Sequence, residues 1–250
     1  MLNILMVAPE PIFEPRGTPL SVVGRCKALS DKGYTVELLT YHIGEDILLP
    51  GLTINRIRRV PGIKRIKIGP SIAKIPLDFL LMLKTFTRLL SGSYDVIHTH
   101  EEAGFWGTLF SKLFRIPHLY DMHSSLPQQL GNFEFTKSKT LVWIFEKLET
   151  WVLKNSESII TICPDLYDHV LDIIPEKGSV LIENVIDYNM IFGEKDRSDE
   201  IRRELNPDGR SVALYTGTFE PYQGLDMLIE AAAYVKEKKS DTLFLLVGGK

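Results

Sequence analysis

A short apolar run at the start of the chain constrains the fold most. Residues 2–8 read LNILMVA, which is typical of a parallel strand buried on both faces of a sheet. Ten residues rich in proline and glycine follow and end at Gly17-Thr18-Pro19. Thr18 fits an N-cap and Pro19 a first helical residue. We therefore expect an inner strand of an open α/β sheet, followed by a turn and a helix.

The turn after this strand is a candidate ligand contact. Unpaired amides at a helix N-terminus, together with the helix dipole, favour anions and polar groups. Open α/β sheets also bind ligands at the carboxyl ends of their strands. We therefore expect Gly17 and the amides that follow it to contact an anionic or polar ligand. The segment has no GxGxxG pattern, so a plain strand-to-helix turn explains the same residues.

The composition excludes several classes of protein. Lys plus Arg number 29 against 32 Asp plus Glu, for a net charge of −3, which argues against a nucleic-acid partner. Cys26 and Cys163 lie far apart without metal-ligand spacing, and we expect reduced packing residues of a cytoplasmic protein. The first apolar run does not resemble a signal peptide, and no window resembles a membrane span. A soluble or peripheral protein is expected.

The strand and helix pattern then repeats along the chain. Further strand-like runs lie at residues 34–41, 52–60, 93–100, 116–122, 158–163 and 179–182, and helical stretches lie at 19–32, 75–90, 103–114, 139–155 and 164–174. This alternation predicts a doubly wound, mostly parallel, Rossmann-like α/β domain over residues 1–187. A polar linker at 188–210 follows. A strand, a helix and a strand within 211–250 then predict the start of a second, incomplete Rossmann-like domain.

One block of the sequence is strongly basic. Seven Lys or Arg residues lie between Arg56 and Lys74, and no acid occurs there until Asp78. An apolar helix with Lys84 and Arg88 on its polar side follows. Such a block fits an anionic membrane surface or a phosphorylated acceptor. A solvated loop followed by a helix that packs on the core explains the same residues.

Polar side chains follow two successive strands. His98 and His100 face one side of their strand and are followed by Glu101 and Glu102, and the next strand leads to His123. Two histidines without a third spaced ligand are weak grounds for a metal site. Because carboxyl ends of parallel strands meet at one edge of a sheet, we expect these groups to line a cleft there.

Several motifs in order resemble a known family. They are Pro15-Arg-Gly-Thr-Pro19, Asp95-Val-Ile-His-Thr-His100, Tyr120-Asp-Met-His123, Ile160-Thr-Ile-Cys-Pro164, Ile182-Glu-Asn-Val-Ile-Asp187 and the segment from Tyr215 to Ala231. In this order and spacing the chain resembles the group-one (family-four type) retaining GT-B glycosyltransferases. The resemblance covers the whole chain, although Cys163 stands where that family usually has a serine.

The resemblance implies a two-domain enzyme. The acceptor would bind in the N-terminal domain and a nucleotide-sugar donor mainly in the C-terminal one, without a metal ion. His123 would lie near the transferred sugar as the candidate catalytic residue. The implied donor- and acceptor-binding residues are Arg16, Gly17, Thr18, His100, Glu102, Asn184, Gly217, Thr218 and Gln223. The family's phosphate clamp has an Arg and a Lys at the positions of Thr218 and Gln223, so those two cations are missing.

We therefore expect a glycosyltransferase that moves a sugar from a nucleotide-sugar to a lipid-linked or polysaccharide acceptor with retention. Location at the inner face of the cell membrane is expected. The family's donor-binding glutamate pair would lie beyond Lys250, and on that basis the 250-residue chain is expected to be inactive by itself. Two alternatives stay open. One is a non-catalytic binding module of the same fold, and the other is a sugar-nucleotide epimerase that uses Glu101 and Glu102.

Overall fold

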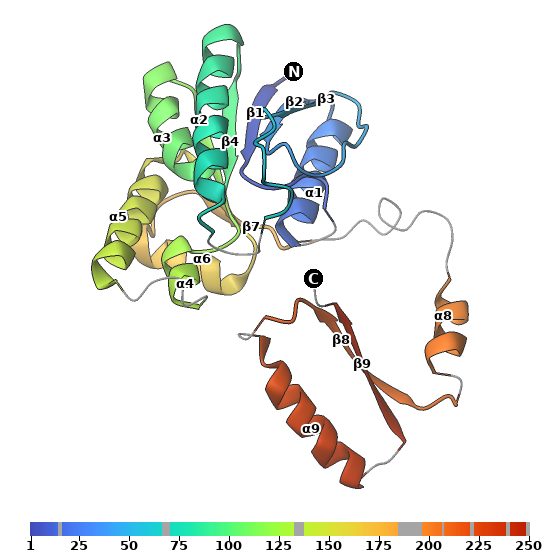
Figure 1. Cartoon of the computed structure of the whole chain (residues 1–250). Coiled ribbons are helices and arrows are strands. Elements are labelled where there is room, and N and C mark those ends of the chain that lie inside the picture. Colours follow the sequence, from blue (N-terminus) through green and yellow to red (C-terminus); the bar gives the residue numbers. More distant parts are fainter. Residues whose placement is uncertain are drawn as a thin grey trace. The chain divides into compact units, whose positions relative to one another are not determined.

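The computed structural model describes residues 1–14, 17–66, 71–132, 138–184, 197–206, 208–220, 223–238 and 241–248 (Figure 1). The chain divides into two compact units, Met1–Asp187 and Tyr188–Lys250. Several positions singled out in the sequence lie outside the described residues, namely Pro15, Arg16, Lys67, residues 185–187 and 221–222, and part of the predicted linker at 188–210.

The first unit is built on a seven-stranded sheet. Its strands are β1 (Asn3–Ala8), β2 (Thr35–Thr40), β3 (Leu52–Arg56), β4 (Val96–His100), β5 (His118–Met122), β6 (Ser158–Thr161) and β7 (Ser179–Leu181). Their order is β3-β2-β1-β4-β5-β6-β7, and every neighbouring pair is parallel. The chain thus winds in one direction from β1 to β3 and in the other from β4 to β7. The switch between the two directions lies between β1 and β4.

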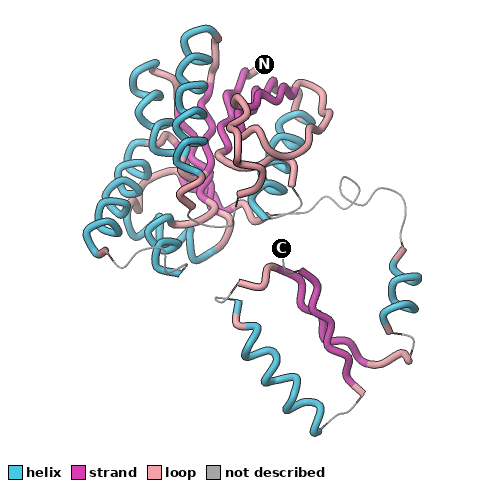
Figure 2. Tube along the Cα trace, in the orientation of Figure 1, coloured by secondary structure: helices cyan, strands magenta, loops and turns pink. Residues whose placement is uncertain are grey.

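Helices cover both faces of this sheet, as the strand and helix alternation predicts (Figure 2). They are α1 (Gly17–Asp31), α2 (Lys74–Ser91), α3 (Ala103–Phe114), α4 (Leu126–Asn132), α5 (Lys139–Asn155) and α6 (Pro164–Ile173). Leu5 and Val7 of β1 pack in one cluster with α2 and α3. Met6 points the other way, and its sulfur lies 3.5 Å from the thiol of Cys26 on α1. Because strand side chains alternate between faces, β1 serves two helical layers.

Local chemistry sets several helix ends. Ser138 is the N-cap of α5, where its hydroxyl accepts the amide proton of Leu141 at 3.4 Å, and Pro164 opens α6. Both are favoured starting residues because the first helical amides have no partner within the helix. α1 begins at Gly17, two residues before the expected start at Pro19. β3 ends at Arg56, where a longer strand was expected.

In the described part of the second unit, a helix precedes a parallel strand pair. Its elements are α8 (Ser198–Leu205), β8 (Ser211–Gly217), α9 (Leu225–Lys238) and β9 (Thr242–Gly248). β8 and β9 pair in register from Ser211 with Thr242 to Gly217 with Gly248. No described residue of these two strands or of α9 is buried.

Candidate functional site at the switch point of the sheet

The polar groups predicted at the strand ends meet beside the switch point of the sheet. Glu10 follows β1, His100 ends β4 and His123 follows β5. β4 and β5 pair with His100 opposite Asp121. Open α/β sheets bind ligands at such a switch point, beside the carboxyl ends of the strands.

Three histidines surround the carboxylate of Asp121. Its Oδ2 lies 3.4 Å from Nε2 of His98 and 3.8 Å from Nδ1 of His100, and its Oδ1 lies 3.2 Å from Nε2 of His123. The rings of His98 and His100 are stacked with centroids 4.7 Å apart, as strand alternation predicts. All four side chains are buried, so these contacts act in a medium of low dielectric.

Burial and the contacts among these side chains shift their pKa values in different directions. Burial favours a neutral Asp121, but hydrogen bonds from His123 and His98 outweigh it and hold its pKa well below 3.8. Burial also works against a charged His123, yet Asp121 outweighs this and raises the pKa of His123 above 6.5. Burial lowers the pKa of His100 well below 6.5. Asp121 is therefore the anion of the group, His100 is neutral, and His123 is the histidine that gains a proton most readily.

Arg25 of α1 ties this group to the end of β7. Its Nε donates to Oδ2 of Asp121 at 2.9 Å, and its Nη2 donates to the carbonyl of Ile182 at 3.0 Å. Nearby, the hydroxyl of Ser21 donates to Oδ1 of Asn184 at 2.6 Å. Through these contacts α1 holds the ends of β5 and β7 together beside the histidines.

Two acids, Glu10 and Glu101, lie close enough to His123 to raise its pKa. Burial is the main cause that raises the pKa of Glu10, to about 8, and Glu101 adds to it. Burial likewise raises the pKa of Glu101. Glu101 has φ +47°, a left-handed conformation that is uncommon for residues other than glycine. Its Oε2 accepts the hydroxyl of Ser124 at 2.8 Å. Glu10 and Glu101 therefore keep their protons to a higher pH than carboxyl groups usually do.

A half-buried lysine of α2 reaches the same edge. Nζ of Lys74 lies 2.5 Å from Oε1 of Glu102. One turn further along α2, Asp78 accepts a hydrogen bond from the hydroxyl of Tyr41, and burial raises the pKa of Asp78 to about 7. These contacts fix the start of α2 against the loops after β2 and β4.

Comparison with known protein families identifies the family of this chain. Residues 16–189, more than half of the chain, match the profile of Glycosyltransferase Family 4. The chain belongs to glycosyltransferase family 4. A comparison with curated protein sequences gave no match. The family assignment agrees with the resemblance seen in the sequence motifs.

Solved structures show the same GT-B fold as this family 4 domain. Sucrose-phosphate synthase from Thermosynechococcus elongatus is 19% identical with a TM-score of 0.73, covering 100% of this chain and 63% of its own. The catalytic domain of starch synthase IV from Arabidopsis thaliana, bound to ADP and acarbose, is 16% identical with a TM-score of 0.72, covering 99% of this chain and 68% of its own. WaaG, a glycosyltransferase involved in lipopolysaccharide biosynthesis, is 12% identical with a TM-score of 0.63, covering 97% and 62%.

The predicted site residues of this family 4 domain fall into separate places. His100 and His123 are in contact, with Nδ1 of His100 3.1 Å from Nε2 of His123. Gly17 and Thr18 form the first turn of α1, and Glu102 is paired with Lys74. The remaining described ones are Asn184, bonded to Ser21, and Gly217, Thr218 and Gln223, which belong to the second unit. Arg16 lies outside the described residues.

Three groups of this site, Glu10, Arg25 and Asp121, were given no role from the sequence. Lys74 was expected to belong to the basic block, and it is paired with Glu102 instead. Asp121 stands inside the Tyr120 to His123 motif, so its position two residues before His123 was an available signal. Glu10 stands in a proline-rich turn, which gives no sign that its side chain is buried.

His98, His100 and Asp121 are close enough together to bind one metal ion. One ligand atom from each lies within 4.8 Å of the others. However, the guanidinium of Arg25 lies 2.9 Å from Oδ2 of Asp121, and a fixed cation at the shared oxygen opposes a divalent ion there. The arrangement fits a carboxylate held by hydrogen bonds better than a metal centre.

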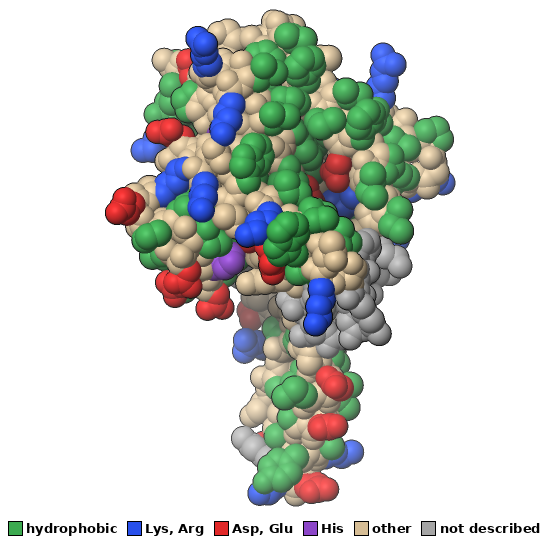
Figure 3. Space-filling model, turned by 90° about the vertical axis from the view of Figure 1, so that its left-hand side faces the viewer, with side chains coloured by type: hydrophobic (Ala, Val, Ile, Leu, Met, Phe, Trp, Pro, Cys, Tyr) green, Lys and Arg blue, Asp and Glu red, His purple; other side chains and the backbone are tan. Residues whose placement is uncertain are grey.

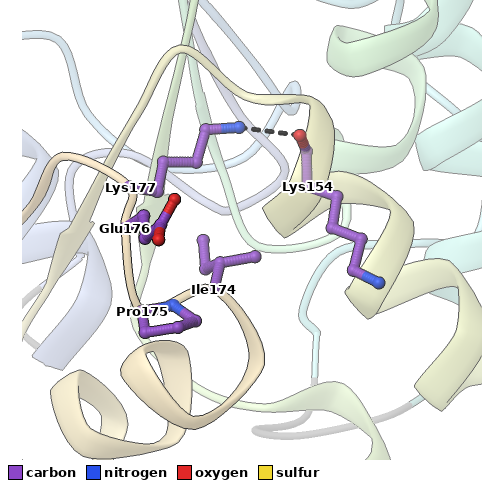
Figure 4. Close-up of a pocket in the computed structure, with 5 residues that line it drawn as sticks. All are labelled: Lys154, Ile174, Pro175, Glu176 and Lys177. Atoms are coloured by element: carbon purple, nitrogen blue, oxygen red, sulfur yellow. Dashed lines mark hydrogen bonds between the residues drawn. The ribbon is translucent and has the colours of Figure 1, made fainter.

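A hollow in the first unit lies at the other edge of the sheet (Figure 4). It is lined by Lys154, Ile174, Pro175, Glu176 and Lys177, which precede β6 and β7 and so lie near the amino ends of the strands. Lys177 donates to the carbonyls of Leu153 at 3.2 Å and Lys154 at 2.8 Å. It therefore caps the end of α5, as lysines often do at helix C-termini, and the hollow is distinct from the histidine site.

Proposed function

We propose that this protein is a retaining glycosyltransferase that moves a sugar from a nucleotide-sugar donor to a lipid-linked or polysaccharide acceptor. One observation carries the proposal. In a family 4 domain, Nδ1 of His123, Nε2 of His100 and Oε1 of Glu10 are buried beside the switch point, and none has a hydrogen-bond partner among the described residues. Buried polar atoms without partners are costly in a folded protein, and sugar hydroxyls supply both donors and acceptors.

Each group has a proposed role in the transfer. His123 contacts the transferred sugar near the reacting carbon, and Glu10, protonated at neutral pH, donates to an oxygen of the donor or acceptor sugar. Burial of the edge keeps water away from the reacting centre. The amides of Gly17 and Thr18 at the start of α1 face a phosphate. We propose that the reaction uses no metal ion or cofactor besides the nucleotide-sugar.

A transfer assay tests this function. The protein, expressed from its complete gene so that any residues outside the 250 are included, is incubated with radiolabelled UDP-, ADP- and GDP-sugars and with lipid and glycan fractions as acceptors. Transferred label with the anomeric configuration of the donor is expected for at least one pair. We expect His123→Ala to reduce the rate by at least about a hundredfold.

The control for this variant is His169→Ala. His169 also contacts a buried carboxylate, with Nε2 2.9 Å from Oε1 of Glu149, but it lies on α6 outside the site. It should lower stability and leave the transfer rate nearly unchanged. Hydrolysis or epimerisation of the nucleotide-sugar without transfer to any acceptor would overturn the proposed function.

A binding module of the same fold is the second candidate, and one observation favours it. Thr218 and Gln223 stand where a phosphate clamp would carry an Arg and a Lys. Cations there stabilise a leaving diphosphate in the transition state. Calorimetry distinguishes the two: a module binds a glycan or glycolipid with the same affinity in the presence and absence of nucleotide-sugar, and no bond is broken.

We also propose that the acceptor is reached at the inner face of a cell membrane through α2. Its outer side carries an apolar stripe in which Ile75, Phe79 and Leu83 are 65%, 56% and 44% exposed. Figure 3 faces the side of the first unit that carries α2 and α3, and hydrophobic side chains gather there. The preceding segment exposes Arg58, Arg59, Lys64 and Arg65. Apolar side chains bordered by cations fit an anionic bilayer surface.

Among the described residues, no helix is long and apolar enough to cross a membrane, so the proposal concerns surface contact. Co-sedimentation with phosphatidylglycerol vesicles should be salt-sensitive and absent with phosphatidylcholine. Each basic residue near an anionic surface contributes about 1 kcal/mol, so changing the four exposed cations to Gln should weaken binding more than a hundredfold. Changing Lys236 and Lys238 to Gln is the matched control. Equal binding to both vesicle types would overturn membrane contact and leave the transfer reaction untouched.

A further inference from the structure

The two ring nitrogens of His123 have different surroundings. Nε2 lies 3.2 Å from Oδ1 of Asp121, an ion-pair contact, and 3.1 Å from Nδ1 of His100, its hydrogen-bond partner. Oδ1 of Asp121 is buried and has no other partner among the described residues. Nδ1 is buried and has no hydrogen-bond partner among the described residues. Because one nitrogen is engaged inside the domain, only the other is left for a ligand. The ring orientation therefore decides which atom meets the substrate.

Asp121 is itself held in place from several sides. Its Oδ2 accepts Nε of Arg25 at 2.9 Å, and it lies in register with His100 on the neighbouring strand. Arg25 is anchored in turn by its bond to the carbonyl of Ile182. The carboxylate thus has a fixed direction, with Oδ2 toward Arg25 and Oδ1 toward His123.

We propose that Asp121, held by Arg25, is a positioning residue that engages Nε2 of His123 and so presents Nδ1 to the sugar substrate. A carboxylate that accepts one N–H of an imidazole fixes both its tautomer and its orientation. Asp121 acts through His123 and touches no substrate. The inference rests on the proposed function for its consequences in transfer, but the ring geometry is measurable without any turnover.

Replacing Asp121 and replacing Arg25 should change the proton affinity of His123 in opposite directions. Facing it are Asp121 from β5, His100 and Glu101 from the end of β4, and Glu10 from the loop after β1. Asp121→Asn removes the anion that favours a protonated ring. Arg25→Gln removes a cation and leaves Asp121 with more charge for His123. A general loss of structure would move both variants in the same direction, so opposite shifts identify the contact.

Two-bond ¹H–¹⁵N correlation spectra of the histidine rings give the first test. In the wild type, Nε2 of His123 should be protonated over the whole range and Nδ1 should titrate. In Asp121→Asn the proton affinity of His123 should fall at least about tenfold, which is one pKa unit, and both tautomers should appear. In Arg25→Gln the affinity should rise. His123→Gln assigns the signal.

The matched control is Glu149→Gln, which removes the other buried carboxylate that contacts a histidine, His169. It should leave the His123 signals in place. Unchanged His123 titration and tautomer in a folded Asp121→Asn protein would overturn the proposal. If that variant does not fold, Arg25→Gln decides alone, because the side chain of Arg25 is 15% exposed and its replacement should be tolerated. A fall in the proton affinity of His123 in Arg25→Gln would contradict the proposal.

Transfer kinetics give the second test. Asp121→Asn should lower kcat at least about tenfold with little change in KM, and it should add almost nothing in a His123→Ala background, because residues that act as one unit are not additive. Additive losses in the double variant would contradict a role through His123. Absence of transfer in the wild type would remove the proposed function, whereas the ring spectra would still decide the positioning role.

Discussion

Both units contain a strand, a helix and a second, parallel strand in succession, β1-α1-β2 in the first and β8-α9-β9 in the second, but they bury these elements differently. All residues of β1 except Asn3 are buried, whereas β8 has no buried residue and neither has α9. β1 lies between β2 and β4 and under helices on both faces, while β8 pairs with β9 alone. Burial is therefore set by the number of layers around a strand more than by its own apolar pattern.

The comparison extends from packing to chemistry. The carboxyl end of β1 leads to Glu10, whose pKa burial raises to about 8, and β4 beside it brings His100 into contact with His123. Low dielectric is what gives such groups unusual proton affinities and strong mutual contacts. The corresponding turn after β8 presents Gly217 and Thr218 on a surface-exposed strand end. The described groups with strongly shifted proton affinities thus lie mainly in the first unit.

Hydrogen exchange should show the largest difference between the units. Amides of β1 and β4 exchange only when the seven-stranded sheet opens, whereas a pair of strands with one helix is marginally stable. We expect amides of β1 to exchange on the order of a thousandfold more slowly than those of β8. Mass spectrometry of peptic peptides measures both in one sample, with α5 and α9 as a second pair. Equal protection of β1 and β8 would contradict the comparison.

A matched pair of truncations should show the next largest effect. Leu81 of α2 is 0% exposed and Leu214 of β8 is 61% exposed. Leu81→Ala should lower the free energy of unfolding by about 2–5 kcal/mol because it leaves a cavity. Leu214→Ala should change it by less than about 0.5 kcal/mol. Urea unfolding followed by tryptophan fluorescence reports on the first unit, since Trp106, Trp143 and Trp151 all lie there, and circular dichroism covers both units.

Most of the elements of the first unit could be predicted from the sequence. Alternating apolar runs and amphipathic stretches gave the strands of the doubly wound sheet and the bounds of α5, because periodicity and caps are local. α4, at Leu126–Asn132, was not expected, because it is short and contains proline and glycine. It packs on α5 in the folded chain. Tertiary contact overrides local preference in such a segment.

The site was predicted in part for a similar reason. The meeting of His100 and His123 follows from parallel strands sharing an edge, which sequence shows. The pairing of Lys74 with Glu102 and of Arg25 with Asp121 joins residues 28 and 96 positions apart, and no local pattern encodes such contacts. Pairwise contacts of this kind depend on how helices dock on the sheet, and only the folded chain shows them.

Removal of the Glu10 carboxyl, whose pKa is raised, should change the pH dependence of stability, and the sign of this change is specific. Glu10 keeps its proton in the folded state up to pH about 8, while in the unfolded chain it loses it near pH 4.5. The folded state therefore binds more protons between these values, and its stability falls as pH rises, with a slope approaching about 1.4 kcal/mol per pH unit. Glu10→Gln should flatten this slope, so that the variant gains on the wild type from pH 5 to pH 8.

The opposite sign is expected for Glu37, which serves as the control. Burial works against its charge, but hydrogen bonds from Arg88, Tyr94 and Asn55 outweigh this and lower the pKa of Glu37. Its stabilising effect is present above pH 4.5 and lost on acidification, so Glu37→Gln should destabilise the protein at neutral pH. Chemical unfolding at several pH values measures both. A Glu10→Gln protein that loses stability relative to the wild type as pH rises would show that this carboxyl is ionised in the folded state, and the first unit would then prepare an anion beside His123.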